Sequence, residues 1–110
     1  MKINIESNFS EEKPITKRIF SNSDVIVVHF YLKKGQKIPM HTSQSTVLVS
    51  VLEGKGKFFI DNEEKFEILR RGEGFIYHPK RNHGFLALED MIVQAVISPN
   101  PSISKIDIKS

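Results

Sequence analysis

The feature that most constrains the fold is a succession of short stretches rich in β-branched and aromatic residues. The stretches end at Gly, Pro, Asn or Asp and follow one another every 8 to 12 residues or so, a spacing that is roughly that of sandwiches and barrels. They are PITKRIF, DVIVVHFYL, TVLVSVLEG, GKFFID, KFEIL, GFIYH, HGFLAL and MIVQAVI. No segment keeps an apolar period of about 3.6 residues for long enough to predict a helix. The pattern therefore predicts an all-β sandwich or barrel.

The length of the chain allows one domain. At 110 residues it is too short for two independent cores, so we expect a single domain over 1–110. The predicted strands occupy about 15–98, and the tail from 99 onward either adds an edge strand or is disordered. Cysteine is absent, which excludes disulfides and thiolate metal ligands. No apolar run approaches the roughly 20 residues needed to cross a bilayer, and we expect a cytoplasmic protein without a membrane partner.

The charge of the chain raises the question of nucleic acid. Sixteen basic and thirteen acidic residues give a formal net charge of +3. The basic residues are scattered as pairs near strand ends, with no aromatic stacking motif between them: Lys17/Arg18, Lys33/Lys34, Arg70/Arg71 and Lys80/Arg81. This pattern favours a solvated surface and predicts no nucleic-acid partner.

The stretch DVIVVHFYL predicts which side chains face the core, because alternate residues of a strand point to opposite faces. One set is uniformly apolar and is expected inside: Ile26, Val28, Phe30 and Leu32. The other set is expected outside and comprises Val25, Val27, His29 and Tyr31. His29 is therefore not predicted to belong to a site. Since the outer set is also largely apolar, the sheet needs a second cover, and we predict a homodimer formed through it.

Two segments combine glycine, proline and histidine at regular spacings. GQKIPMHTSQSTVLVSVLEG places five residues between Gly35 and His41 and six between Val47 and Gly54. GEGFIYHPKRNHGFLALED supplies, in order, Gly72, Glu73, Pro79 and His83. Both segments resemble the motifs of the cupin superfamily, small barrels of the double-stranded β-helix, or jelly-roll, type. The resemblance covers about residues 15–98 and implies that fold.

The resemblance also implies a metal site that this chain keeps only in part. Cupins bind metal through three histidines and a glutamate, and of these positions only His41 and His83 carry a matching residue. Ser43 and Val47 occupy the other two; a serine hydroxyl stays protonated at neutral pH, and valine has no donor atom. In the second motif Lys80 replaces the bend glycine and Ala87 replaces an asparagine. A pair of imidazoles is expected to hold a divalent ion weakly, since catalytic zinc usually has three protein ligands and facial iron sites need a carboxylate.

Three functions stay open at this point. The first is a barrel that binds a small molecule, with or without a divalent ion (Zn, Fe, Ni or Mn) at His41 and His83. The second is a metal-dependent enzyme of oxygenase or isomerase type. The third is a metal-free sensing or structural domain. Val47, in place of the glutamate, favours binding over catalysis, and the cupin fold alone decides nothing because it supports many chemistries.

The expected pocket depends on a predicted hairpin. If Glu89-Asp90 is a two-residue tip, Phe85 pairs with Gln94 and His83 with Val96, so that Gln94 points into the barrel. The lining is then predicted to comprise Val47, Val49, Val51, Phe85, Ile92 and Val96. Ser43, Gln44 and His78 lie in loops at the predicted mouth and are candidates for additional ligand contacts.

Overall fold

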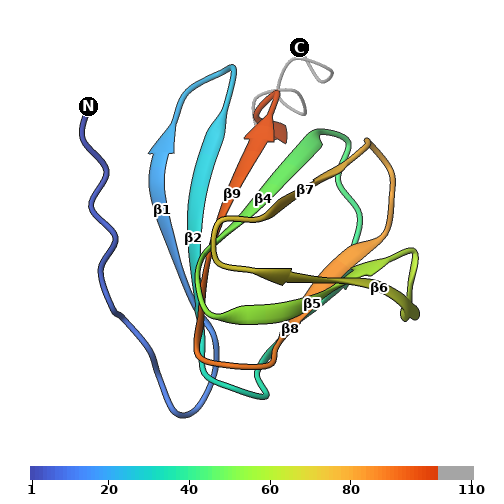
Figure 1. The fold of residues 1–110 in the computed structure, drawn as a ribbon. Coiled ribbons are helices and arrows are strands. Elements are labelled where there is room, and N and C mark those ends of the chain that lie inside the picture. The colour runs from blue at the N-terminus through green and yellow to red at the C-terminus, as the bar shows by residue number, and fades with distance from the viewer. Residues whose placement is uncertain (102–110) are drawn as a thin grey trace.

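The computed structural model describes residues 1–101, whose nine strands form two antiparallel sheets packed face to face (Figure 1). The strands are β1 Ile15–Ser21, β2 Ile26–Leu32, β3 Lys37–His41, β4 Thr46–Glu53, β5 Lys55–Ile60, β6 Asn62–Arg70, β7 Gly74–Tyr77, β8 His83–Ala87 and β9 Met91–Ser98. One sheet has the order β1-β2-β9-β4-β7 and the other the order β3-β8-β5-β6. The all-β prediction is confirmed. Within residues 1–101, no helix is long and apolar enough to cross a membrane.

The core lies between the two sheets and follows the period of two along each strand. On β4, Val47, Val49 and Val51 point inward and are 4%, 1% and 1% exposed, whereas Thr46 and Leu48 on the opposite face are exposed. The inward face predicted for β2 is also confirmed, since Leu32 belongs to the core and Phe30 packs against it. His29 and Tyr31 point to the outer face, as predicted, yet both are buried.

Strand β3 is absent from the predicted stretches, because its sequence KIPMH contains Pro39. Proline removes a backbone donor and is tolerated on an edge strand. β3 is such an edge, paired only with β8 among the described strands, and its register shifts between Ile38 and His41. The irregularity follows from the proline and places His41 directly opposite His83.

The predicted pairing of HGFLAL with MIVQAVI is wrong. Residues 88–90 form a bend that carries the chain from one sheet to the other, so β8 pairs with β3 and β5 while β9 pairs with β2 and β4. Gly54 makes this corner possible: its φ is 83°, and a Cβ there would lie 2.1 Å from the carbonyl oxygen of Asp90. Because a corner between sheets does not preserve the facing of a hairpin, the side-chain directions derived for β9 are reversed.

The two ends of the barrel interior are filled differently. At the end near the β8–β9 corner, Leu32, Phe58 and Met91 are fully buried. Phe30 and Phe85 meet edge to face across the barrel, with ring centroids 5.4 Å apart, and Phe58 stacks against Phe85 at 5.0 Å. These three rings separate the packed end from the open end, where the β3–β4 loop and residues 99–101 lie. The predictions for the tail beyond residue 101 fall outside the described residues.

Candidate ligand pocket and histidine pair

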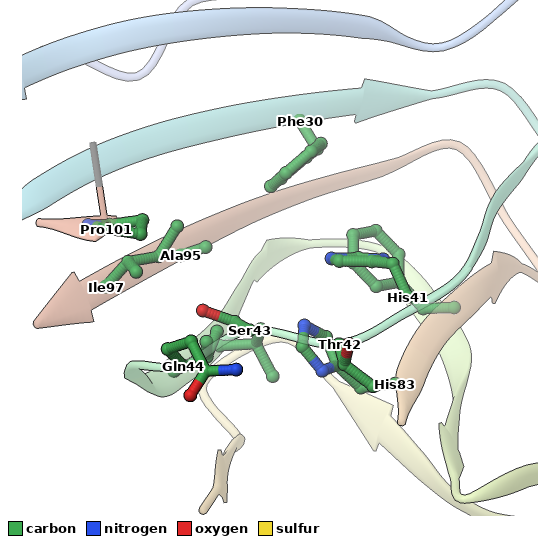
Figure 2. Close-up of a pocket in the computed structure, with 12 residues that line it drawn as sticks. Phe30, His41, Thr42, Ser43, Gln44, His83, Ala95, Ile97 and Pro101 are labelled. Carbon is green, nitrogen blue, oxygen red and sulfur yellow. The ribbon is translucent and has the colours of Figure 1, made fainter. Parts of the chain in front are cut away.

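A cavity of about 420 Å³ occupies the open end of the barrel (Figure 2). Its apolar wall is contributed by both sheets and comprises Phe30, Val47, Val49, Phe85, Ala95 and Ile97. The rest of the lining consists of His41, Thr42, Ser43, Gln44, His83 and Pro101. None of these twelve residues is an aspartate, glutamate, lysine or arginine. The cavity is therefore an apolar space with its polar groups concentrated on one side.

His41 and His83 form a pair at this cavity because β3 and β8 place them opposite each other. Their ring centroids are 4.2 Å apart. The Nδ1 atom of His41 lies 3.0 Å from the carbonyl oxygen of Pro39, and Nδ1 of His83 lies 3.0 Å from that of Arg81. A carbonyl oxygen only accepts, so each Nδ1 carries the hydrogen and donates it. In the neutral rings, Nε2 is left as the unprotonated nitrogen.

His83 sits in an environment that favours its neutral form. Burial lowers the pKa of His83 below its usual value, and the nearby His41 lowers it further, while the hydrogen bond to the Arg81 carbonyl opposes part of the shift. The side chain is 4% exposed, whereas His41 lies exposed at the mouth. At neutral pH the inner histidine is therefore an acceptor and not a cation.

Tyr77 supports the orientation of the His83 ring by stacking against it. The two rings stack with centroids 4.8 Å apart and planes 26° apart. The Tyr77 hydroxyl donates a 3.0 Å hydrogen bond to the carbonyl oxygen of Phe59, and burial raises the pKa of this phenol. Tyr77 is thus a neutral aromatic support for the histidine ring.

The loop between β3 and β4 supplies the remaining polar groups, Thr42, Ser43 and Gln44. The hydroxyl of Ser43 accepts a hydrogen bond from the Ser45 amide at 3.1 Å, and its carbonyl accepts one from the Lys80 amide at 2.7 Å. The second bond connects the loop to the segment that leads into His83. These hydrogen bonds hold the loop in place at the rim of the cavity.

The metal set of the cupins does not fit these residues. Val47 lines the cavity with no donor atom, and Ser43 uses its hydroxyl within its own loop. Nowhere in residues 1–101 do three or more His, Cys, Asp or Glu side chains come together in a way that could hold a metal ion. The described residues at this cavity offer a pair of imidazole nitrogens and no carboxylate.

Most of the predicted pocket residues lie where the sequence placed them. His41, Ser43, Gln44, Val47, Val49, His83 and Phe85 all line the cavity. His78 instead follows the end of β7 as an exposed residue and is not part of the lining.

Gln94 is on the wrong side of its sheet for the predicted role. It pairs with His29 of β2, and its Oε1 accepts a 2.9 Å hydrogen bond from Nε2 of His29. Ile92 and Val96 lie on the same outer face as Gln94. All three were predicted inside because the prediction depended on the same incorrect hairpin. The other ring nitrogen of His29, Nδ1, is buried and has no hydrogen-bond partner within residues 1–101.

Five lining residues were not predicted, and one of them, Thr42, lies directly between the predicted His41 and Ser43. Phe30 belongs to the predicted core face of β2, and only its position beside the histidines was unforeseen. Ala95 and Ile97 have the opposite facing to the predicted one and follow from the correct register of β9 on β4. Pro101 lies in the tail, where no sequence pattern indicated a contact with the barrel.

Comparison with known proteins supports the fold. No protein-family model and no curated protein matches the sequence. Solved structures do match, among them an RmlC-like cupin from Desulfovibrio desulfuricans, with a TM-score of 0.84 and 24% identity over 90% of this chain and 96% of that one. A protein with a double-stranded β-helix domain from Klebsiella pneumoniae gives a TM-score of 0.77 and 24% identity, over 84% and 83% of the two chains. An RmlC-like cupin from Shewanella frigidimarina gives 0.73 and 19%, over 91% and 96%. The chain has the cupin fold, that of a small single-domain barrel.

Proposed function

We propose that the cavity binds a small neutral molecule that has an apolar body and one hydrogen-bond donor directed at the histidine pair. The observation that carries this proposal is the combination of an apolar wall with two neighbouring Nε2 acceptors. The volume of about 420 Å³ lies within the usual range of ligand pockets, roughly 300 to 1,000 Å³. Hydroxyl groups of phenols, enols and alcohols are donors of the required kind.

The chemistry of the lining disfavours anions. A carboxylate or phosphate buried here would lose its hydration without meeting a lysine or arginine, since none of the lining residues within 1–101 is one. Its oxygens would also face the two Nε2 lone pairs, which repel another acceptor. A donor group does the reverse, because it satisfies a nitrogen that otherwise faces apolar surroundings.

A divalent ion at the same histidines is the second candidate. Its support is the hydrogen bond from each Nδ1 to a backbone carbonyl, the arrangement that commonly orients metal-binding histidines through Nε2. Two imidazoles alone would hold such an ion weakly, with water or a ligand oxygen in the other positions. An iron-oxygenase reaction gains no support, since facial iron sites include a carboxylate and none of the lining residues in the described part of the chain supplies one.

Two measurements distinguish the neutral ligand from the divalent ion, and the first is the melting temperature with small probe molecules. We expect para-ethylphenol to raise the melting temperature, whereas ethylbenzene raises it less and para-ethylbenzoate does not raise it. A His41→Ala/His83→Ala variant should lose the difference between para-ethylphenol and ethylbenzene. Stabilisation by para-ethylbenzoate equal to that by para-ethylphenol would contradict the proposed ligand class.

Elemental analysis of protein purified without a histidine tag tests the ion. Close to one metal per chain in the wild type, and none in the double histidine variant, would support the second candidate. Absence of metal from both proteins, together with the para-ethylphenol response, would leave the metal-free pocket as the function.

A further inference from the structure

The chain that follows β9 lies at the open end of the barrel and is held there by buried polar contacts. Asn100 is 3% exposed, and its side-chain amide donates hydrogen bonds to Oγ of Ser21 at 3.0 Å and to the carbonyl oxygen of Asn22 at 2.9 Å. Its backbone amide donates to the carbonyl oxygen of Ser23 at 3.3 Å. These bonds fasten Asn100 to the turn between β1 and β2.

A further contact connects the same segment to the β3–β4 loop at the rim of the cavity. The hydroxyl of Ser45, a residue that is 2% exposed, donates a hydrogen bond to the carbonyl oxygen of Pro99. Buried polar groups with satisfied hydrogen bonds favour a single backbone arrangement, because a displacement would leave them unpaired away from water. The contacts of Asn100 and Pro99 therefore fix the position of the next residue, Pro101.

Pro101 lines the cavity on the side away from the histidine pair (Figure 2). Pro101, Ile97 and Ala95 lie on one side of the view, whereas His41 and His83 lie on the other. The proline ring is apolar and its backbone nitrogen carries no hydrogen, so Pro101 adds no donor to this part of the wall. A ligand whose donor meets the histidines therefore directs its apolar body toward Pro101.

We propose that Pro101, positioned by Asn100, limits the length of the apolar body that the cavity accepts. This inference rests on the proposed function, which places the donor of the ligand at the histidine pair. Among the apolar lining residues in the described part of the chain, Pro101 alone lies outside a strand. Its position therefore depends on the hydrogen bonds of Asn100 and not on the ladder of a sheet. Pro101 is a specificity-determining residue, and Asn100 is a positioning residue that acts through it.

Isothermal titration calorimetry of the full-length protein with para-ethylphenol and para-butylphenol tests the length limit. The measured quantity is the length ratio, defined as the dissociation constant of para-butylphenol divided by that of para-ethylphenol. Pro101→Ala removes two ring carbons, so we expect the length ratio to fall roughly tenfold, because room for one buried CH₂ is worth about fourfold in affinity. Pro79→Ala is the matched control: Pro79 is exposed and does not line the cavity, and this variant should keep the wild-type length ratio.

Asn100→Ala tests the positioning role. The substitution removes both side-chain hydrogen bonds to the β1–β2 turn and leaves Pro101 in the sequence. We expect the length ratio to fall as in Pro101→Ala, because the proline is no longer held in place. A purely structural role of Asn100 would lower the melting temperature and leave the length ratio unchanged. Ser45→Ala removes the bond to Pro99 and is the second variant if Asn100→Ala does not fold, as judged by circular dichroism.

The outcomes separate this inference from the proposed function. A length ratio that is unchanged in Pro101→Ala would overturn the length limit, and one that is unchanged in both Asn100→Ala and Ser45→Ala would overturn the positioning role. Ethylbenzene and butylbenzene repeat the comparison without a hydroxyl group. If the phenols bind no better than these alkylbenzenes, the histidine acceptors fail, whereas a lower alkylbenzene ratio in Pro101→Ala still supports the length limit. Absence of binding by all four probes would overturn both proposals.

Discussion

The two ends of the barrel interior are built from the same strands, but one end is packed with side chains and the other contains a cavity. At the packed end, β2 and β9 contribute Leu32 and Met91, both fully buried and paired across the sheet. At the open end, Val28 and Ile26 of β2 pair with Ala95 and Ile97 of β9, and the two β9 residues line a cavity of about 420 Å³. The comparison shows that one set of strands, with no change in topology, can fill one end of a small barrel with side chains and leave a cavity at the other end.

Aromatic rings form the boundary between these ends. Phe85 contacts Phe30 on one side and stacks on Phe58 on the other, with ring centroids 5.4 Å and 5.0 Å away. Phe30 and Phe85 line the cavity, while Phe58 is 0% exposed and belongs entirely to the core. The cavity is therefore closed from below by residues whose burial also stabilises the fold.

The largest effect is expected from Phe58→Ala at this boundary. Truncation removes a fully buried ring and leaves a cavity, which typically costs about 3–5 kcal/mol of unfolding free energy. Urea denaturation measures the loss, and Phe66→Ala provides an aromatic control because Phe66 is 39% exposed. Equal losses in the two variants would show that the packed end does not carry the stability assigned to it.

A smaller loss is expected when volume is added at the packed end. A Cβ on Gly56 would lie 2.6 Å from Sδ of Met91 and 2.8 Å from the carbonyl oxygen of Leu86. Gly56→Ala should therefore cost on the order of 1–3 kcal/mol of unfolding free energy through overpacking. Combining it with Met91→Ala should cost less than the sum of the two single changes, since the sulfur contact is then gone. Additive losses in urea denaturation would contradict this steric explanation.

The sequence was sufficient for the half of the pocket that depends on positions within single strands. His41 and His83 follow from the motif spacing, and Val47, Val49 and Phe85 from their placement in the predicted barrel. The error over Gln94 arose between strands. An alternating pattern fixes which residues of a strand share a face, but which face is inside depends on the connection, and the bend at 88–90 crosses between sheets. β3 was missed for a related reason, because Pro39 signals a bend unless the strand is known to be an edge.

At the open end, added volume is expected to change binding more than stability. Ala95→Leu extends a side chain into the cavity, so the unfolding free energy should stay within about 1 kcal/mol of the wild type. The same variant should lose the rise in melting temperature caused by para-ethylphenol. Val93→Leu is the matched control, because Val93 is fully buried outside the cavity lining. A para-ethylphenol response retained in Ala95→Leu would show that the probe binds elsewhere.

The smallest effect concerns the proton equilibrium of His83. Its pKa is lowered in the folded protein, chiefly by burial, from the value of 6.5 that applies to the unfolded chain. The unfolded state therefore binds more protons just below pH 6.5, so the unfolding free energy should fall as the pH decreases through that value and level off below the folded pKa. His83→Gln should flatten this part of the profile, whereas His78→Gln, which alters an exposed histidine, should keep it.

The test is to measure the unfolding free energies of both variants at closely spaced pH values. The difference between the two variants removes the titration of the carboxylates, which both share. A profile for His83→Gln that parallels the wild type would contradict this prediction, because it would mean that burial does not disfavour protonation of His83.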